Sequence, residues 1–193
     1  LDVGLVMLIL YCFPLGVAFI SYFRGKSKIV FVQWLSMVVL MLGLYLMLSS
    51  GDQVLNLYGL FISFLGLLFF IAFIVTASDL SEQIGATTFN LYVSILGIIF
   101  LTVGFILPLG FEMDLPLTKT GIFAIFTNGV FYISSWVLFF KGASIIGATR
   151  SSMLACIEPL FAALLAIILL KQILSVTEWI GFFIVLTAIY TFE

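Results

Sequence analysis

The sequence predicts an all-α integral membrane protein, a multi-pass bundle of about seven helices. Two features of its composition lead to this prediction: 64% of the 193 residues are hydrophobic and 8% are charged. Soluble domains carry about 25% charged residues, and a soluble fold needs a polar exterior that this chain cannot supply. A helix that crosses a bilayer needs about 20 mostly apolar residues, and seven segments of the chain meet that requirement.

The seven expected spans are separated by short polar connections. The expected spans are residues 3–23, 29–48, 57–77, 85–109, 120–140, 148–170 and 176–192. The connections between them are, in order, RGKSK, SSGDQ, SDLSEQ, FEMDLPLTK, KGASIIGATR and KQILS. Ser175 and Glu178 have the spacing of a capping box. We therefore expect them to start the last helix.

Several functional classes find no support in the composition. The chain has no His, a net charge of −2 and two cysteines, Cys12 and Cys156, each inside an apolar run. We interpret both as buried thiols, with no disulfide framework, metal site or cofactor. No basic stripe points to nucleic acid. Without an acid/base pair near the spans, the chain is not expected to be an enzyme.

The orientation follows from the basic residues of the short connections. One side of the membrane carries Arg24, Lys26, Lys28, Lys141 and Arg150, whereas the other carries Lys119 and Lys171. Connections rich in Lys and Arg stay in the cytoplasm. This rule predicts that the basic side and the carboxyl terminus are cytoplasmic.

The first two spans repeat in the last two at an offset of 145 residues. The offset aligns scarce residues without a gap: Pro14 with Pro159, Trp34 with Trp179, and Tyr45 with Tyr190. Any two apolar hairpins share some likeness, but the recurring Pro-to-Trp spacing of 20 favours a repeat. Because an odd number of spans separates its two copies, the repeat is inverted, as in many secondary transporters.

The repeat also predicts a larger protein. The last five spans form one unit, and the first two match only the end of that unit. We therefore expect three more helices, roughly 90 residues, before Leu1. The predicted whole is a ten-helix bundle of two inverted halves.

Glu158 is the charged residue expected in the middle of a span. A charge there costs about 2.5–3.5 kcal/mol, so such residues face a bundle interior or a wet cavity and are often functional. One interpretation is an acid that couples transport to protons or binds substrate. The other is a neutral side chain that satisfies carbonyl groups freed by Pro159.

Pro14 and Pro159 remove backbone donors from the middle of their helices and should kink them. Such kinks could act as pivots or gates, or they could be static bends that serve packing. We expect a mixed role.

Two further spans carry polar side chains on one face. The first face includes Asn90, and the second has Asn128 and Tyr132 at i and i+4 with Trp136 beside them. Polar groups in lipid need partners, so both faces should point inward. They would either line a substrate path, together with Tyr11, or hydrogen-bond between helices.

The segments GATRSSMLACIEPLFAALLA (147–166) and LKQILSVTEWIG (170–181) resemble the last two helices of the EamA family in the drug/metabolite transporter superfamily. Helices 3–23 and 29–48 look like its fourth and fifth helices. The resemblance implies that 1–50 ends the first repeat and that 51–193 forms the second. The chain departs from the family pattern in two ways. It lacks the first three helices, and it has Leu170-Lys171 where the family has Gly-Glu.

The resemblance implies a multi-pass carrier of small metabolites, such as amino acids, or of drugs, working by alternating access in a cell membrane, here a bacterial inner membrane. Its expected partners are a small-molecule substrate, the lipid bilayer and protons as a candidate coupling ion. The oligomeric state stays open. The alternatives are a seven-helix receptor or sensor and a membrane scaffold that does not transport.

Overall fold

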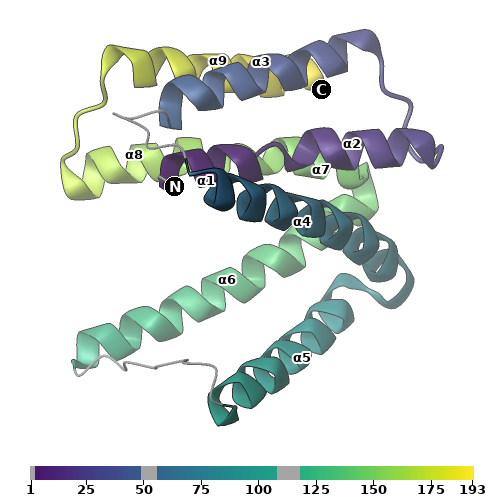
Figure 1. Cartoon of the computed structure of the whole chain (residues 1–193), viewed down its shortest axis with the longest axis vertical. Coiled ribbons are helices and arrows are strands. Elements are labelled where there is room, and N and C mark those ends of the chain that lie inside the picture. Colours follow the sequence, from purple (N-terminus) through teal and green to yellow (C-terminus); the bar gives the residue numbers. More distant parts are fainter. Residues whose placement is uncertain (1–2, 49–55, 108–117) are drawn as a thin grey trace. The chain divides into compact units, whose positions relative to one another are not determined.

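The computed structural model describes residues 3–48, 56–107 and 118–193, which fold into helices and contain no strand within those ranges (Figure 1). The helices are α1 (Val3–Leu10), α2 (Phe13–Phe23), α3 (Phe31–Leu48), α4 (Leu57–Ile84), α5 (Ala86–Ile106), α6 (Lys119–Ile146), α7 (Ala148–Ala155), α8 (Glu158–Leu170) and α9 (Val176–Phe192). This confirms the all-α fold class.

Most of these helices can cross a bilayer. Six helical segments are long and apolar enough: Gly4–Phe23, Phe31–Leu48, Leu57–Ile84, Ala86–Ile106, Lys119–Ile146 and Ala148–Leu170. The seventh, α9, has 17 apolar residues, at the lower end of what a span of about 17–25 residues requires. The chain is therefore a multi-pass helical membrane protein.

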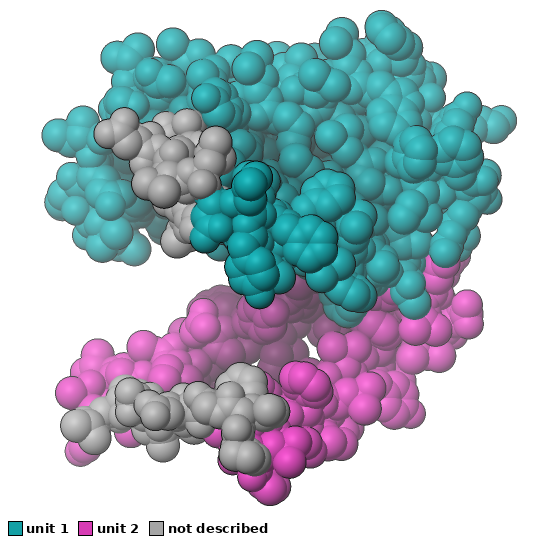
Figure 2. Space-filling model, viewed as in Figure 1, with its two compact units in different colours: residues 1–76, 146–193 teal, residues 77–145 magenta. Residues whose placement is uncertain are grey.

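The described chain divides into two compact units, coloured separately in Figure 2. The first comprises residues 1–76 and 146–193, and the second comprises residues 77–145. The first unit holds the repeated helices and most of the buried core. The second is formed by the end of α4, by α5 and by nearly all of α6.

Two predicted connections turn out to be helical. We expected spans to end at residues 77 and 140, but α4 continues to Ile84 and α6 to Ile146. The polar segments past those points contain no Pro or Gly that would stop a helix, apart from Gly142, so the backbone continues its hydrogen bonding. Each helix ends just before a glycine with positive φ, Gly85 at 86° and Gly147 at 89°, a conformation that glycine adopts without strain.

The other predicted boundaries differ less. α3 begins two residues later than expected, at Phe31, and α9 spans 176–192 as predicted. The predicted connection at 49–53 and most of that at 111–119 lie outside the described residues. The first and sixth spans, each expected as one kinked helix, are instead two helices each, broken at 11–12 and at 156–157.

The helix boundaries follow the sequence repeat. α1 and α7 begin at Val3 and Ala148, α2 and α8 at Phe13 and Glu158, and α3 and α9 at Phe31 and Val176; each pair is 145 positions apart. Both broken helices therefore break at the same place in the repeat. The repeat detected in the residues extends to the backbone.

α3 and α9 pack side by side and run in opposite directions (Figure 1). At one end of the pair, Gln33 Nε2 donates to the Phe192 carbonyl oxygen at 3.0 Å, and the hydroxyls of Ser36 and Thr191 are hydrogen-bonded at 2.9 Å. At the other end Gly181 faces Gly43. Small residues at such a crossing let two backbones approach closely in a membrane.

The predicted capping box starts α9. The Glu178 N–H donates to Ser175 Oγ at 3.3 Å, and the Ser175 N–H donates to Glu178 Oε2 at 2.6 Å. Glu178 therefore satisfies backbone donors at a helix start, as the spacing predicted.

We predict that Gly181→Ala destabilises the α3–α9 pair. An added Cβ atom would lie 2.6 Å from the Gly43 carbonyl oxygen and 2.8 Å from the Met47 backbone nitrogen. The backbones must separate, at a cost of about 1–3 kcal/mol. Reversible unfolding in mixed micelles would measure this loss.

The matched control is Gly66→Ala, because nothing lies within 4 Å of a Cβ at Gly66. Its stability should equal or exceed that of the wild type, since alanine favours helix over glycine. Equal effects of the two substitutions would contradict the close contact.

Candidate functional site

The break between α1 and α2 follows from Pro14. Proline has no N–H, so Pro14 cannot donate the hydrogen bond that the Leu10 carbonyl would accept in a regular helix. The chain tightens instead: the Cys12 N–H donates to the Ile9 carbonyl and the Leu15 N–H to the Cys12 carbonyl, both at 3.1 Å. The carbonyl groups of Leu8, Leu10 and Tyr11 therefore lack the N–H partner that a regular helix would supply.

The break between α7 and α8 repeats this geometry. Pro159 removes the usual donor to the Ala155 carbonyl. The Cys156 N–H donates to the Met153 carbonyl at 3.2 Å, and the Leu160 N–H to the Ile157 carbonyl at 3.1 Å. Both prolines thus do more than kink a helix, because each divides its span into two short helices.

The two breaks lie against each other inside the first unit. The side chains of Tyr11 and Glu158 are neighbours across the two breaks, close enough to interact. The Cys156 side chain lies near those of Cys12 and Glu158. Tyr11 and Cys156 occupy the same position in the repeat, so the contact forms where one copy of the repeat meets the other.

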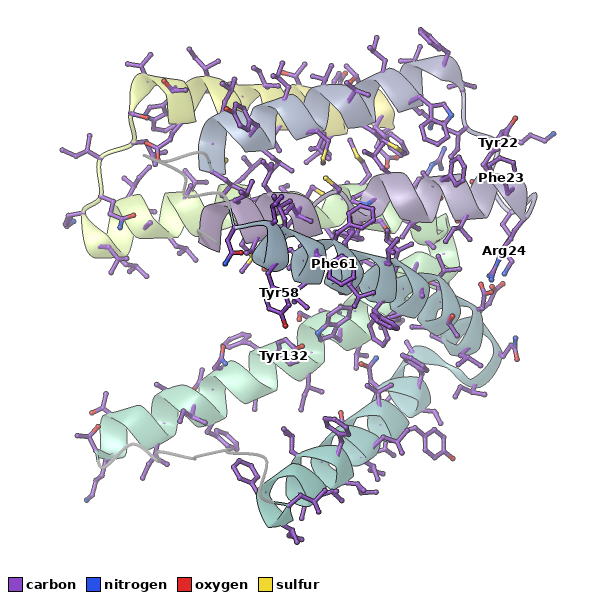
Figure 3. All side chains as sticks on the ribbon, viewed as in Figure 1. Tyr22, Phe23, Arg24, Tyr58, Phe61 and Tyr132 are labelled. Carbon is purple, nitrogen blue, oxygen red and sulfur yellow. The ribbon has the colours of Figure 1, made fainter. Side chains whose placement is uncertain are left out.

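Sulfur atoms add to this contact. Cys12 Sγ lies 3.3 Å from Met41 Sδ of α3, and Cys156 is completely buried. In Figure 3 much of the sulfur, drawn in yellow, lies between the α3–α9 pair and the broken helices. We expected both cysteines to be buried, but Cys12 is only partly buried, and the sequence analysis missed their proximity at the breaks.

Burial differs sharply around the breaks. Phe13, Pro14 and Pro159 are buried, Tyr11 is partly buried and Glu158 is exposed. A charged carboxylate does not face hydrocarbon at this depth. The exposed side of Glu158 must therefore border water or another part of the protein.

The predicted residues of α6 belong to the second unit. The rings of Tyr132 and Trp136 pack edge to face with centroids 6.3 Å apart, and Trp136 stacks on Phe140 at 5.6 Å. Tyr132, labelled in Figure 3, is 61% exposed, and Asn128 is exposed as well. These three side chains share one face of α6, as the spacing predicted.

Asn90 of α5 has a different environment. Its side chain is buried, and its Nδ2 donates to the Ala86 carbonyl oxygen at 2.9 Å, within the same helix. This hydrogen bond lies within α5 and is not the bond between helices that was one of the two interpretations of Asn90. The structure thus brings Tyr11 to Glu158 and Tyr132 to Trp136, and it satisfies Asn90 locally.

The described residues contain no group of three or more His, Cys, Asp or Glu side chains that could hold a metal ion. What the breaks offer are a carboxylate, a phenol hydroxyl and backbone carbonyls with free acceptor capacity. Such groups can bind a proton, a hydrogen-bond donor or a cation.

Comparisons with known proteins identify relatives of the chain. The family model of the EamA-like transporter family matches residues 57–192, which include α4 to α9. No solved structure matches the chain.

A curated protein matches a shorter stretch. It is an inner membrane transporter of Salmonella typhimurium (strain LT2), YicL, described as uncharacterized, and it is 38% identical over 52 residues. That stretch covers 27% of this chain and 17% of the relative.

We predict that Tyr11 and Glu158, which lie side by side at the breaks, form an interhelical hydrogen bond that contributes to stability. A double-mutant cycle with Tyr11→Phe and Glu158→Gln should give a coupling energy of about 0.6 kcal/mol and up to about 1.7 kcal/mol, as for other interhelical hydrogen bonds in membranes. Unfolding in mixed micelles provides the four stabilities.

Tyr190→Phe serves as the control, since Tyr190 is 83% exposed. It should change stability by less than about 0.5 kcal/mol and show no coupling to Glu158→Gln. Strictly additive effects of the Tyr11 and Glu158 substitutions would argue against the contact.

Proposed function

The chain belongs to the EamA-like transporter family, and from this premise we propose that it is part of a secondary transporter for small metabolites, such as amino acids, or for drugs. The observation that supports this proposal most directly is the meeting of two broken helices at equivalent positions of the repeat. In secondary transporters, discontinuous helices near the midplane form the substrate and ion sites.

The substrate path in this proposal passes the helix breaks. Glu158 supplies a negative charge, Tyr11 a hydroxyl, and the backbone at each break supplies carbonyl acceptors. Asn128, Tyr132 and Trp136 add an amide and aromatic faces on α6, where a polar or aromatic metabolite would find complementary contacts. Asn90 contributes less, because its amide already has a partner.

Alternating access is proposed to bend the protein at the breaks. α3 and α9 touch through Gly43 and Gly181 with no room for an added Cβ, so this pair moves as one body. Each break lacks several regular helical hydrogen bonds, so bending there disrupts fewer interactions than bending elsewhere. Pro14 and Pro159 would then be the pivots of the motion.

The proposed complete carrier has ten helices. Residues 1–50 would end its first repeat and residues 51–193 would form its second. The matched 52 residues are 17% of the relative, which is therefore about 300 residues long, and ten spans fit that length at roughly 20 residues each plus connections. The basic connections would place the carboxyl terminus in the cytoplasm.

Proton coupling is proposed to act through Glu158. Protonation cancels its charge and weakens its attraction for a cation or for the Tyr11 hydroxyl, while deprotonation restores both. A carboxylate that alternates between these states can exchange a proton for a substrate.

We predict that full-length protein in proteoliposomes accumulates at least one compound from a pooled amino-acid and metabolite mixture, and that a pH gradient drives it. Glu158→Gln should abolish the dependence on the gradient, because an amide cannot release a proton at this pH. Isotope or mass-spectrometric flux measurements at several internal pH values test both statements.

Glu178→Gln is the matched control. It makes the same chemical change at a residue that caps α9, and a glutamine can still complete a capping box, so gradient dependence should persist. Gradient-driven uptake by the Glu158→Gln variant would refute the coupling role. Absence of flux for the whole pool would count against the carrier itself.

A further inference from the structure

Helix α4 covers the first broken span next to its break. The rings of Phe13 and Phe70 pack edge to face with centroids 5.0 Å apart. One turn further along α2, the side chain of Ile71 occupies the space that a Cβ atom at Gly16 would need. α4 therefore lies directly against α2 (Figure 1). On this covered face Phe13 is 5% exposed and Val17 is 0% exposed.

The corresponding face of α8 is open. The covered face of α2 consists of Phe13, Gly16, Val17 and Ile20, and the repeat offset of 145 carries these positions to Glu158, Phe161, Ala162 and Leu165. All four residues of α8 are exposed, Phe161 by 59% and Leu165 by 52%. They stand at i, i+3, i+4 and i+7, so they share one side of the helix. We call these four residues the α8 face.

The mixed chemistry of the α8 face restricts what can cover it. Lipid chains suit Phe161, Ala162 and Leu165, but a carboxylate such as that of Glu158 does not face hydrocarbon. Water suits the carboxylate and leaves the three apolar side chains hydrated, which is unfavourable. A neighbouring helix that is apolar apart from one polar side chain satisfies all four residues.

We propose that the α8 face is the docking surface for a transmembrane helix of the same protein, the first helix of its first repeat, which covers α8 as α4 covers α2. α4 is the first helix of the second repeat in the proposed carrier. Its counterpart would precede it by about 145 positions and would lie upstream of Leu1. This inference rests on the ten-helix carrier of the proposed function and deepens it, since it assigns one upstream helix to one surface.

The proposed contact has to differ from its counterpart at two positions. Where α4 presents the ring of Phe70 to Phe13, the upstream helix meets the carboxylate of Glu158 and must present a hydrogen-bond donor. Where α4 approaches Gly16, the upstream helix meets the ring of Phe161 and needs a small residue to come equally close. The upstream helix thus gives Glu158 a partner in addition to Tyr11.

Disulfide cross-linking in membranes tests the docking. In the full-length protein with its native cysteines replaced by alanine, Phe161→Cys is combined with single cysteines over three turns of the upstream helix, centred 145 positions before Ile71. Copper phenanthroline serves as the oxidant. Because a disulfide needs Cβ atoms about 3.5–4.5 Å apart, the best pair should cross-link at least about tenfold faster than the same partner with Leu164→Cys.

Leu164→Cys is the matched control on the same helix. Leu164 lies one turn from Phe161, and its counterpart Phe19 stays 55% exposed although α4 packs on α2. The pair Phe13→Cys and Phe70→Cys, whose native rings are in contact, shows that the oxidant reaches such a position. The rate with Phe161→Cys should rise and fall with the period of a helix along the upstream scan.

A second measurement needs no cysteine. Brominated lipids quench the fluorescence of a tryptophan that touches lipid. Phe161→Trp should add fluorescence that these lipids leave largely unquenched, whereas Leu164→Trp should add fluorescence that they quench. Equal quenching of both added signals would place the α8 face against lipid and overturn the inference.

The remaining outcomes also decide the question. Equal cross-linking with Phe161→Cys and Leu164→Cys, or cross-links between two copies of the Phe161→Cys variant in place of the upstream pair, would assign the surface to another occupant and overturn the docking. A full-length chain without a membrane helix at that upstream position would refute the ten-helix premise itself. Neither readout depends on flux, so a protein that transports nothing can still confirm the docking.

Discussion

Every peptide group inside a bilayer has to find its hydrogen-bond partner within the protein, because hydrocarbon offers none. This constraint explains why the described residues form helices. It also makes each polar group that lacks a regular partner informative about function. At the breaks, Pro14 and Pro159 deny partners to carbonyl groups in mid-span, and at the start of α7 two hydroxyls are buried unpaired. The two proline breaks and the hydroxyls of Thr149 and Ser151 lie along the two broken spans, and the buried hydroxyls of Ser27 and Ser78 lie outside them.

The first unit contains a closely packed helix pair and, beside it, two broken helices. Gly43 and Gly181 bring α3 and α9 into backbone contact, and the ends of that pair are joined by hydrogen bonds from Gln33 and Ser36. The broken helices beside it are short, lack regular hydrogen bonds and touch through Tyr11 and Glu158. In the proposed carrier, the α3–α9 pair would hold its shape while the broken helices change conformation.

Much of this arrangement could be predicted from residue patterns. The last span and its capping box, the prolines at the same repeat position and the mid-span acid all follow from local spacing or from an offset between segments. The extensions of α4 and α6 could not, since polar residues such as those of SDLSEQ are compatible with a helix in water and with a loop. Asn90 was expected to line a substrate path or to bond between helices, and its amide donates to a carbonyl of its own helix. Spacing identifies the face of a helix but not the partner of a side chain.

The sequence by itself determined that the chain is a multi-pass helical protein, that its ends repeat in opposite orientation, and that Glu158 is the acid to explain. These properties follow from residue composition and from the spacing of residues, which can be read from each segment by itself. Only the tertiary structure decided that Tyr11 meets Glu158, that Cys12 lies against Met41 and that Thr149 and Ser151 are buried without partners. Such contacts join residues far apart in the chain, and they depend on how the helices cross, which no single segment specifies.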